Sequence, residues 1–282
     1  MIFFLPRART FGSLPPKTQP LLETMQSFPI DHIVVDIDDT LTGNQPGVAQ
    51  IDSRHLNGNV LFDLLRDCLV EAGSPSPAAE ARLLDHVERH PFWDYSDIIE
   101  ALALPPRTTW ARLVAWHDRN LQVYEDGVQM VRRLHDAGFA LSISSNNPLS
   151  GCLLKLHRAG LATLESSPWF SRIYASNVLM GQKSAPHWWP RLQEALGVPP
   201  ERVLVVGDNP RDDMQMPRAA GFQHFVLVDR TQPEPWRRVD GVHFVNSLDA
   251  VPAIIANLNG APVEVPRVPS PPARQTTRKV MS

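Results

Sequence analysis

The sequence has little cysteine and no long apolar run. Two cysteines, Cys68 and Cys152, occur among 282 residues, and both lie in helix-like stretches. This scarcity argues against a disulfide framework or a cysteine-based zinc site and favours a reducing compartment. The apolar run near the start, residues 2–5, is too short for the core of a signal peptide, and no other run approaches the length of a bilayer-spanning helix. We therefore expect a cytoplasmic protein without a membrane anchor.

Excess charge is also small. The formal net charge is −3, so bulk attraction to nucleic acid or to an anionic membrane surface is not expected. Lysine is especially scarce, with only Lys17, Lys155, Lys183 and Lys279 among the 27 basic residues. Because arginine supplies most of the positive charge, a lysine within a motif indicates a tight site that needs a compact ammonium, with a chance surface lysine as the alternative. None of these numbers indicates an oligomeric state.

The chain divides into tails, a core and an insertion. Proline is concentrated near both ends, which predicts a flexible extension over residues 1–28 and a disordered tail over residues 260–282. Between them, short apolar runs alternate with helical patterns, as in a doubly wound α/β fold whose parallel sheet is covered on both faces. The expected strands are HIVVDI, FALSISS, RIYAS, RVLVVG and HFVLVD, at residues 32–37, 139–145, 172–176, 202–207 and 224–229.

One long segment interrupts this alternation. Residues 45–120 contain helical patterns such as NVLFDLLRDCLVEAG but no convincing strand. We expect a helical cap domain over the carboxyl edge of the sheet, where ligands bind in open α/β folds, and a core formed by residues 29–44 and 121–259. An extra helical layer without function is the alternative. The aromatic stretch within the insertion, RHPFWDYSDI at residues 89–98, is expected to be core rather than site.

The first predicted strand ends in acid, in the stretch IVVDIDDTLTG. Side chains alternate along a strand, so Asp36 and Asp38 are expected to face the same way and to share one site. Two ionised carboxylates about 5 Å apart repel by about 3 kcal/mol at an effective dielectric near 20, and a bound cation would offset this repulsion. The alternative is an acidic turn, because aspartate is common in turns and at helix N-caps.

Polar residues also follow later strands. They are Ser145 and Asn146, then Lys183, then Asp208 with Asp212 and Asp213 after a turn. In a parallel sheet these strand ends meet at one edge. Together with the two acids of the first motif, Asp208 and Lys183 leave two negative charges in excess, which one divalent cation would balance. Ligands that are all oxygen favour magnesium over zinc.

Such a site can accept a phosphate group. The cation and Lys183 would attract a phosphate dianion, and Ser145 could donate a hydrogen bond to its oxygens. Asn146, next to Ser145, is also expected to bind the substrate. Asp36 would attack phosphorus to give an aspartyl phosphate. Asp38 would protonate the departing alkoxide and then activate the water that releases phosphate. The set of residues therefore predicts phosphoryl transfer.

These motifs, in this order, resemble those of the haloacid dehalogenase-like (HAD) superfamily of hydrolases, in particular its members with a helical cap between the first two motifs. DIDDTLT is similar to the first motif, SISSN to the second and VVGDNPRDD to the fourth, and Lys183 falls where the lysine of the third belongs. The resemblance covers residues 30–229. It implies that magnesium is held by the Asp36 side chain, the Asp38 backbone carbonyl and Asp208, with Asp213 as a helper. Ser144 and Asp212 are the alternatives in register for Ser145 and Asp213.

The resemblance implies a magnesium-dependent phosphatase that acts on a small phosphorylated metabolite. Dehalogenases of the superfamily lack an acid two residues after the nucleophile, so Asp38 favours phosphate over halide. A phosphomutase or a catalytically silent HAD-like binding protein is the alternative. A response-regulator receiver domain also combines acids, a hydroxyl and a lysine, but here Lys183 precedes Asp208, which disfavours it. Pro217 lacks an N–H and predicts a short or kinked helix after the fourth motif.

Overall fold

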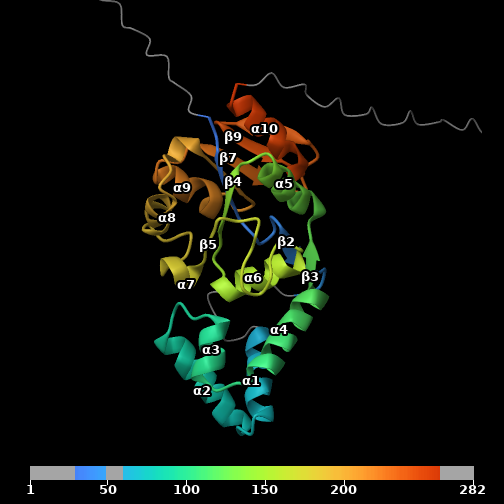
Figure 1. Cartoon of the computed structure of the whole chain (residues 1–282), viewed down its shortest axis with the longest axis vertical. Helices are drawn as coiled ribbons and strands as arrows, with labels where there is room; N and C mark the ends of the chain where they lie inside the picture. The colour runs from blue at the N-terminus through green and yellow to red at the C-terminus, as the bar shows by residue number, and fades with distance from the viewer. Residues whose placement is uncertain (1–28, 49–59, 261–282) are drawn as a thin grey trace, which may run out of the picture.

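The computed structural model describes residues 29–48 and 60–260 (Figure 1). A sheet and its flanking helices form the upper part of the view, and helices α1 to α4 extend below it. The tails expected over residues 1–28 and 260–282 lie outside the described residues, apart from Gly260, and so do residues 49–59 of the insertion.

The upper part is built on a seven-stranded sheet in the order β5-β4-β1-β6-β7-β9-β8. All neighbouring strands are parallel except β8 and β9, which form an antiparallel hairpin at one edge. The strands are β1 (His32–Val35), β4 (Ala140–Ser144), β5 (Arg172–Tyr174), β6 (Val203–Gly207), β7 (His224–Val228), β8 (Trp236–Val239) and β9 (Val242–Val245). The predicted α/β fold with a largely parallel sheet is confirmed, while the hairpin β8-β9 was not predicted.

Alternating side chains give the sheet two buried faces. Along β1, Ile33 and Val35 enter one apolar cluster while Val34 enters another. The first face is covered by α5 (Glu125–Asp136), α6 (Leu149–Arg158) and α10 (Val251–Leu258), and the second by α7 (Ser176–Leu179), α8 (Trp188–Leu196) and α9 (Met216–Ala219). Burial on both faces explains why the central strands are apolar at nearly every position.

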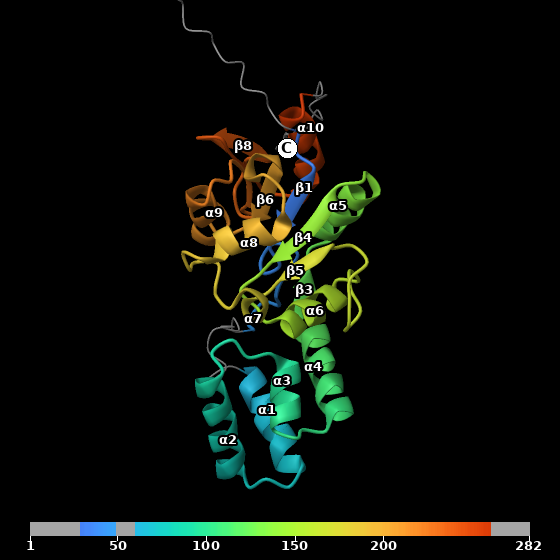
Figure 2. The same cartoon turned by 60° about the vertical axis from the view of Figure 1, so that its left-hand side comes forward.

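Below the sheet, four helices of the described residues form a helical unit (Figure 2). They are α1 (Val60–Glu71), α2 (Ser76–Arg89), α3 (Tyr95–Ala101) and α4 (Pro106–Asn120). Their apolar cluster includes Leu65, Leu83, Trp93 and Trp116, so the aromatic stretch around Trp93 is part of a core, as expected. The chain enters and leaves this unit through β2 (Thr42–Asn44) and β3 (Leu121–Val123), which pair in antiparallel orientation.

Polar contacts join the helical unit to the start of α6. The Asp94 carboxylate, which precedes α3, accepts hydrogen bonds from the backbone N–H of Ser150 at 2.9 Å and from Asn177 Nδ2 at 3.4 Å. The Tyr95 N–H in turn donates to Ser150 Oγ at 3.1 Å. Asp94 is buried, so these bonds are shielded from water and fix α3 over the N-terminus of α6.

The chain after β6 continues in a π-helical turn, Arg211–Gln215, before the short α9. The Gln215 N–H donates to the carbonyl of Pro210, five residues earlier, at 2.9 Å. Pro217 has no N–H, and its ring clashes with the carbonyl four residues earlier in a regular helix, so a wider turn precedes it. The α-helix that follows has four residues, in agreement with the short helix that Pro217 predicts.

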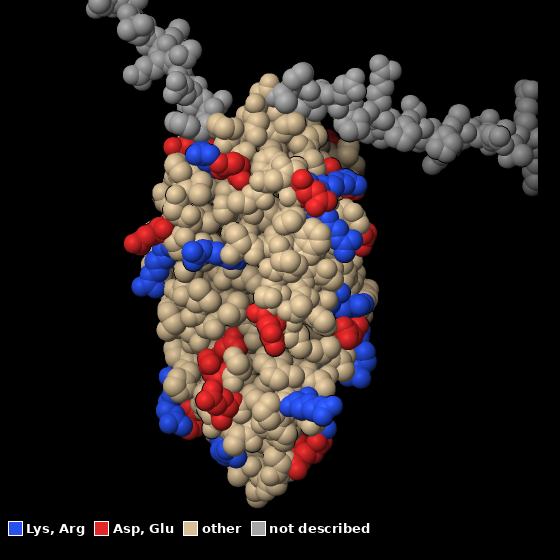
Figure 3. All heavy atoms as spheres, in the orientation of Figure 1, with Lys and Arg blue, Asp and Glu red and all other residues tan. Residues whose placement is uncertain are grey.

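The surface agrees with the small net charge. On the face drawn in Figure 3, acidic and basic side chains are interspersed over both the sheet part and the helical unit. Within the part of the chain that the structure describes, no helix has both the length and the apolar character that a membrane crossing requires.

Candidate active site

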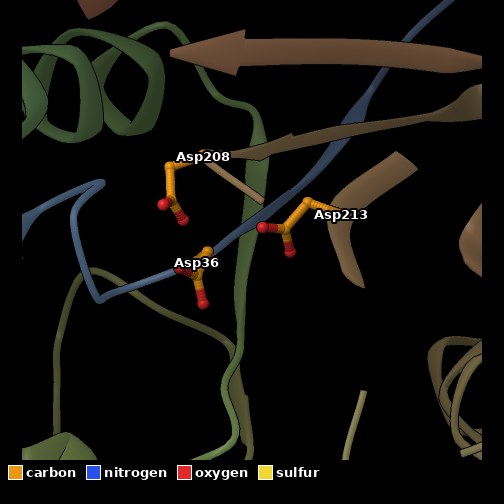
Figure 4. Close-up of side chains that lie close together, drawn as sticks. All are labelled: Asp36, Asp208 and Asp213. Carbon is orange, nitrogen blue, oxygen red and sulfur yellow. The ribbon is translucent and has the colours of Figure 1, made fainter. Parts of the chain in front are cut away.

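Three carboxylates meet at the carboxyl edge of the sheet. Asp36 directly follows β1, and its N–H donates to the carbonyl of Val206 in β6 at 2.9 Å. Asp208 directly follows β6, and Asp213 lies in the π-helical turn. One carboxylate oxygen from each lies within 4.8 Å of the others. Figure 4 shows the three side chains grouped at the ends of the strands.

Lys183 supplies positive charge to this carboxylate cluster. Its ammonium donates to Asp36 Oδ1 and to Asp213 Oδ1, both at 2.6 Å, and all three side chains are buried. The backbone N–H of Lys183 donates to Asn146 Oδ1 at 2.7 Å, so a residue just after β4 fixes the lysine backbone. Burial alone would lower the pKa of Lys183, but the carboxylates of Asp213 and Asp36 outweigh it and hold that pKa above its usual range.

A glycine makes room for Asp213. A Cβ atom added at Gly207 would lie 2.3 Å from Cγ of Asp213, far inside van der Waals contact. The Asp213 carboxylate accepts a hydrogen bond from the Asn209 N–H at 3.1 Å, which fixes it from the other side. The neighbouring Asp212 instead accepts from Asn146 Nδ2 at 3.0 Å. The two successive aspartates of the turn therefore bond to different side chains, and Asp213 is the one beside Asp36.

Burial and mutual repulsion disfavour the ionised forms of these acids. Burial, reinforced by the neighbouring acids and opposed by Lys183, raises the pKa of Asp36 well above its usual range. Burial and then the charge of Asp213 raise the pKa of Asp208 to about 7. Burial likewise raises the pKa of Asp213, against the attraction of Lys183. One ammonium is thus not enough to stabilise three ionised carboxylates.

The cluster fits a divalent hard cation. Its three ligand atoms are carboxylate oxygens, and this set suits magnesium better than zinc, which favours nitrogen and sulfur ligands. Two negative charges remain when the ammonium of Lys183 is set against the three carboxylates, and a dication would offset them.

Asp38 lies near this cluster but is held by other groups. Lys155 Nζ donates to its Oδ1, and Asn147 Nδ2 donates to its Oδ2 at 2.5 Å. Partial burial would raise the pKa of Asp38, but the charge of Lys155 and these hydrogen bonds outweigh it and lower that pKa. The side chains of Asp36 and Asp38, which were expected to face the same way and share one site, bond to different lysines. The physical reason is that β1 ends at Val35, so strand alternation does not extend to Asp38.

Ser145 follows β4 and is fully buried. Its N–H donates to the carbonyl of Tyr174 at 2.9 Å, and its hydroxyl oxygen accepts from Asn147 Nδ2 at 2.8 Å. Ser144, in contrast, accepts from Trp188 Nε1 at 3.1 Å and so faces the α8 side of the sheet. Of the two serines, Ser145 is the one next to the residues that hold Asp38.

A family model for haloacid dehalogenase-like hydrolases matches residues 30–221, which include every residue of the site. The chain belongs to this family. The resemblance read from the motifs is confirmed at this level, and a search of curated proteins finds no match.

Solved structures similar to this HAD-like hydrolase differ in their activities. A HAD phosphatase from Thermococcus onnurineus is 22% identical, with a TM-score of 0.49 over 83% of this chain and 100% of its own. A 2-haloacid dehalogenase from Pseudomonas syringae pv. Tomato DC3000 is 18% identical, with a TM-score of 0.50 over 81% of this chain and 99% of its own. The likeness to the Pseudomonas structure shows the fold alone, so the reaction has to be argued from the site.

A cleft of about 390 Å³ adjoins the carboxylate cluster of this HAD-like hydrolase. Asp208 lines it, together with the apolar residues Leu227 and Phe244 and the basic residues Arg230 and Arg237. Asp208 therefore connects the cluster to a cavity large enough for a small molecule.

The sequence prediction missed two residues, Asn147 and Lys155. Lys155 is one of four lysines and interrupts an apolar run, CLLKL at residues 152–156. That run was a usable signal, because a lysine inside an apolar helix must find a partner for its charge. The sequence did not reveal that the partner is Asp38, since the contact joins residues that are 117 positions apart.

Proposed function

We propose that this HAD-like hydrolase is a magnesium-dependent phosphatase that hydrolyses a small phosphomonoester through an aspartyl phosphate on Asp36. The observation that carries the proposal is a second, separately held acid, Asp38, two residues after Asp36 and outside the carboxylate cluster. Loss of an alkoxide from phosphorus calls for a proton donor, whereas loss of a halide does not. An acid at position 38 therefore favours a phosphomonoester over a halogenated compound as the substrate.

Asp36 is the nucleophile in this proposal. Lys183 donates to Asp36 Oδ1, which orients the carboxylate at the end of β1. An oxygen of Asp36 forms a bond to phosphorus while the bond from phosphorus to the leaving oxygen breaks. The ammonium of Lys183 lowers the repulsion between the attacking carboxylate and the phosphate dianion.

Asp38 transfers the protons. Its lowered pKa leaves it ionised before substrate binds, so in this proposal it takes up the proton that a phosphomonoester monoanion brings and passes that proton to the leaving oxygen in the first step. In the second step it takes a proton from water, as the water oxygen bonds to phosphorus and the bond from phosphorus to Asp36 breaks. Ser145 accepts a hydrogen bond from Asn147, and a hydroxyl that accepts still carries an O–H for donation to a phosphoryl oxygen. Asn146 already bonds Lys183 and Asp212, which supports a role in holding the lysine rather than only in touching substrate.

The carboxylate cluster holds the metal in this proposal. The side chains of Asp36, Asp208 and Asp213 and the backbone carbonyl of Asp38 would bind magnesium. When bound, it supplies a divalent charge that offsets the cluster and the phosphate. The raised pKa values of the three acids support this assignment, because they reflect carboxylates that lack enough positive charge among the protein groups.

A small phosphorylated metabolite is the proposed substrate class. The helical unit is attached to the core at Asp94 and Ser150, and a unit so close to the strand ends favours a small substrate over a folded phosphoprotein. The cleft beside Asp208 offers space of the right size for the remainder of such a molecule.

The test is phosphate release from a panel of small phosphomonoesters, with and without magnesium. We expect magnesium-dependent release that falls by at least about 1000-fold in Asp36→Asn, because the nucleophile is lost. The matched control is Asp97→Asn, which removes an exposed acid of α3 and should leave the rate unchanged. Equal release by Asp36→Asn would contradict the proposal. Transfer of the phosphoryl group within the substrate, without release, would indicate a mutase, and neither release nor a trapped aspartyl phosphate would indicate a binding protein.

A further inference from the structure

Lys155 is a buried cation to which the proposed reaction gives no role. It lies on α6 between Leu154 and Leu156, and its side chain is only 8% exposed. Burying an unpaired ammonium among apolar groups is costly, so the partners of this lysine indicate what it does. They are Asp38 Oδ1 and, at 3.0 Å, Asn147 Oδ1.

Asn147 completes a ring of three side chains with Lys155 and Asp38. Its Nδ2 donates to Asp38 Oδ2 at 2.5 Å while its Oδ1 accepts from Lys155. Asn147 is itself held, because its N–H donates to Ser145 Oγ at 3.2 Å and its carbonyl accepts from the Ser176 N–H at 2.9 Å. Each carboxylate oxygen of Asp38 therefore has a donor whose position is set by α6 or by the turn that precedes it. The Asp38 carboxylate is oriented although its side chain is 48% exposed.

The contacts of Lys155 are separate from those of Lys183. Lys183 bonds Asp36 and Asp213, whereas the bonds of Lys155 within the described residues go to Asp38 and Asn147. The charge of Lys155 therefore acts on the reaction through Asp38, whereas Asn147 also bonds Ser145.

We infer that Lys155, together with Asn147, is a positioning residue that holds the Asp38 carboxyl group toward the leaving oxygen and then toward the attacking water. This inference rests on the proposed phosphatase activity. Asp38 lies beyond the end of β1, where no ladder of strand hydrogen bonds fixes its backbone on both sides. A displacement of about 1 Å at a reacting group costs on the order of 100-fold in rate. Lys155 keeps its own protons, and the transferred proton moves between Asp38 and the leaving oxygen or water.

The test is a double-mutant cycle on Lys155→Met and Asp38→Asn, with the same phosphomonoesters. Methionine keeps most of the buried stem of lysine and removes its charge. We expect Lys155→Met to lower kcat by roughly 10- to 100-fold and to change KM by less than about threefold. In the Asp38→Asn background the same substitution should cost less than about threefold, because its effect passes through Asp38.

Two further measurements separate positioning from a general structural role. The value of kcat/KM in Lys155→Met should fall at least about tenfold more for an alkyl phosphate than for p-nitrophenyl phosphate, whose leaving group needs no proton. Arg158→Met removes a cation from the same helix outside the proposed machinery and should leave both substrates unaffected. If Lys155→Met does not fold, Lys155→Gln, which also removes the charge, takes its place in the cycle, with the same expected loss of additivity.

Suppose that the wild-type protein releases phosphate and that the losses in kcat of the two single variants multiply in the double variant. This result would overturn the inference and leave the proposed function intact. Equal losses for both classes of leaving group would do the same. A wild-type protein that releases no phosphate would instead overturn the proposed function, and the role of Lys155 with it.

Discussion

Lys183 and Lys155 are both buried ammonium groups, yet the balance of charge around them differs. Lys183 lies among three carboxylates and cannot neutralise them, and the pKa values of those acids are raised. Lys155 faces one carboxylate and one amide, and the pKa of its acid is lowered. A buried group of carboxylates with excess negative charge has the donors that a cation would need, whereas a balanced pair has a fixed orientation.

The largest expected difference is in stability and its response to magnesium. Lys183→Met leaves crowded carboxylates without their counter-charge, so we expect the free energy of unfolding to fall by about 3–5 kcal/mol. Added magnesium should restore part of it, because an ion that binds only the folded state stabilises that state. Lys155→Met should be less destabilised and should gain no more from magnesium than the wild type. Urea unfolding of both variants, with and without magnesium, measures these free energies. An equal increase with magnesium in both variants would show that the two lysines do not differ in this respect.

A smaller effect is expected within the carboxylate cluster itself. Asp213→Asn removes one carboxylate beside Asp36 and should weaken magnesium binding by about 10- to 100-fold, since ligand charge tunes the affinity for hard cations. Asp212→Asn is the matched control, because that side chain bonds Asn146 and lies outside the cluster. The magnesium affinity of Asp212→Asn should stay within about threefold of the wild-type value. Titration calorimetry measures both, and a stronger loss in Asp212→Asn would reverse the assignment of the two aspartates.

The smallest expected effect is on the pH dependence of stability, and it comes from His117 in α4. Burial, opposed by a hydrogen bond to the Leu113 carbonyl and helped by the charge of Lys155, lowers the pKa of His117 to about 4. An unfolded histidine has a pKa of about 6.5, so the unfolded chain binds more protons between these values and stability falls as the pH drops from about 6.5 toward 4.

His117→Asn should flatten this pH dependence. Asparagine keeps a donor for the Leu113 carbonyl but does not titrate. We expect the loss in the free energy of unfolding between pH 7 and pH 5 to be smaller in the variant by about 1–2 kcal/mol. Urea unfolding at the two pH values is the measurement. Parallel curves for the variant and the wild type would show that His117 does not contribute to the acid response.

The parallel strands and the order of the motifs were predictable from the sequence. Apolar runs such as VLVVG indicate strands buried on both faces, and acids placed directly after two such runs indicate neighbouring strand ends. The helical insertion was predictable because its apolar residues recur at helical spacing. These are local patterns, and the sheet topology brings them together.

The hairpin β8-β9 was harder to predict because β8 is largely exposed and contains two arginines, so it lacks an apolar run. Its turn did carry a signal, since Asp240 and Gly241 both have positive φ values, of 50° and 80°, as an Asp-Gly hairpin turn requires. The partnership of Asp38 with Lys155 had no comparable local signal. It depends on how α6 packs beside the end of β1, which is a property of the tertiary structure.

The close approach of Gly207 and Asp213 couples the evolution of these two positions. A methyl group at position 207 has no space while the carboxylate stays at position 213. A lineage that acquires a side chain at 207 must therefore first shorten or move the residue at 213, and it loses an oxygen beside Asp36 in doing so. Among descendants of this chain, a residue larger than glycine at position 207 would indicate a protein without the position 213 carboxylate beside Asp36.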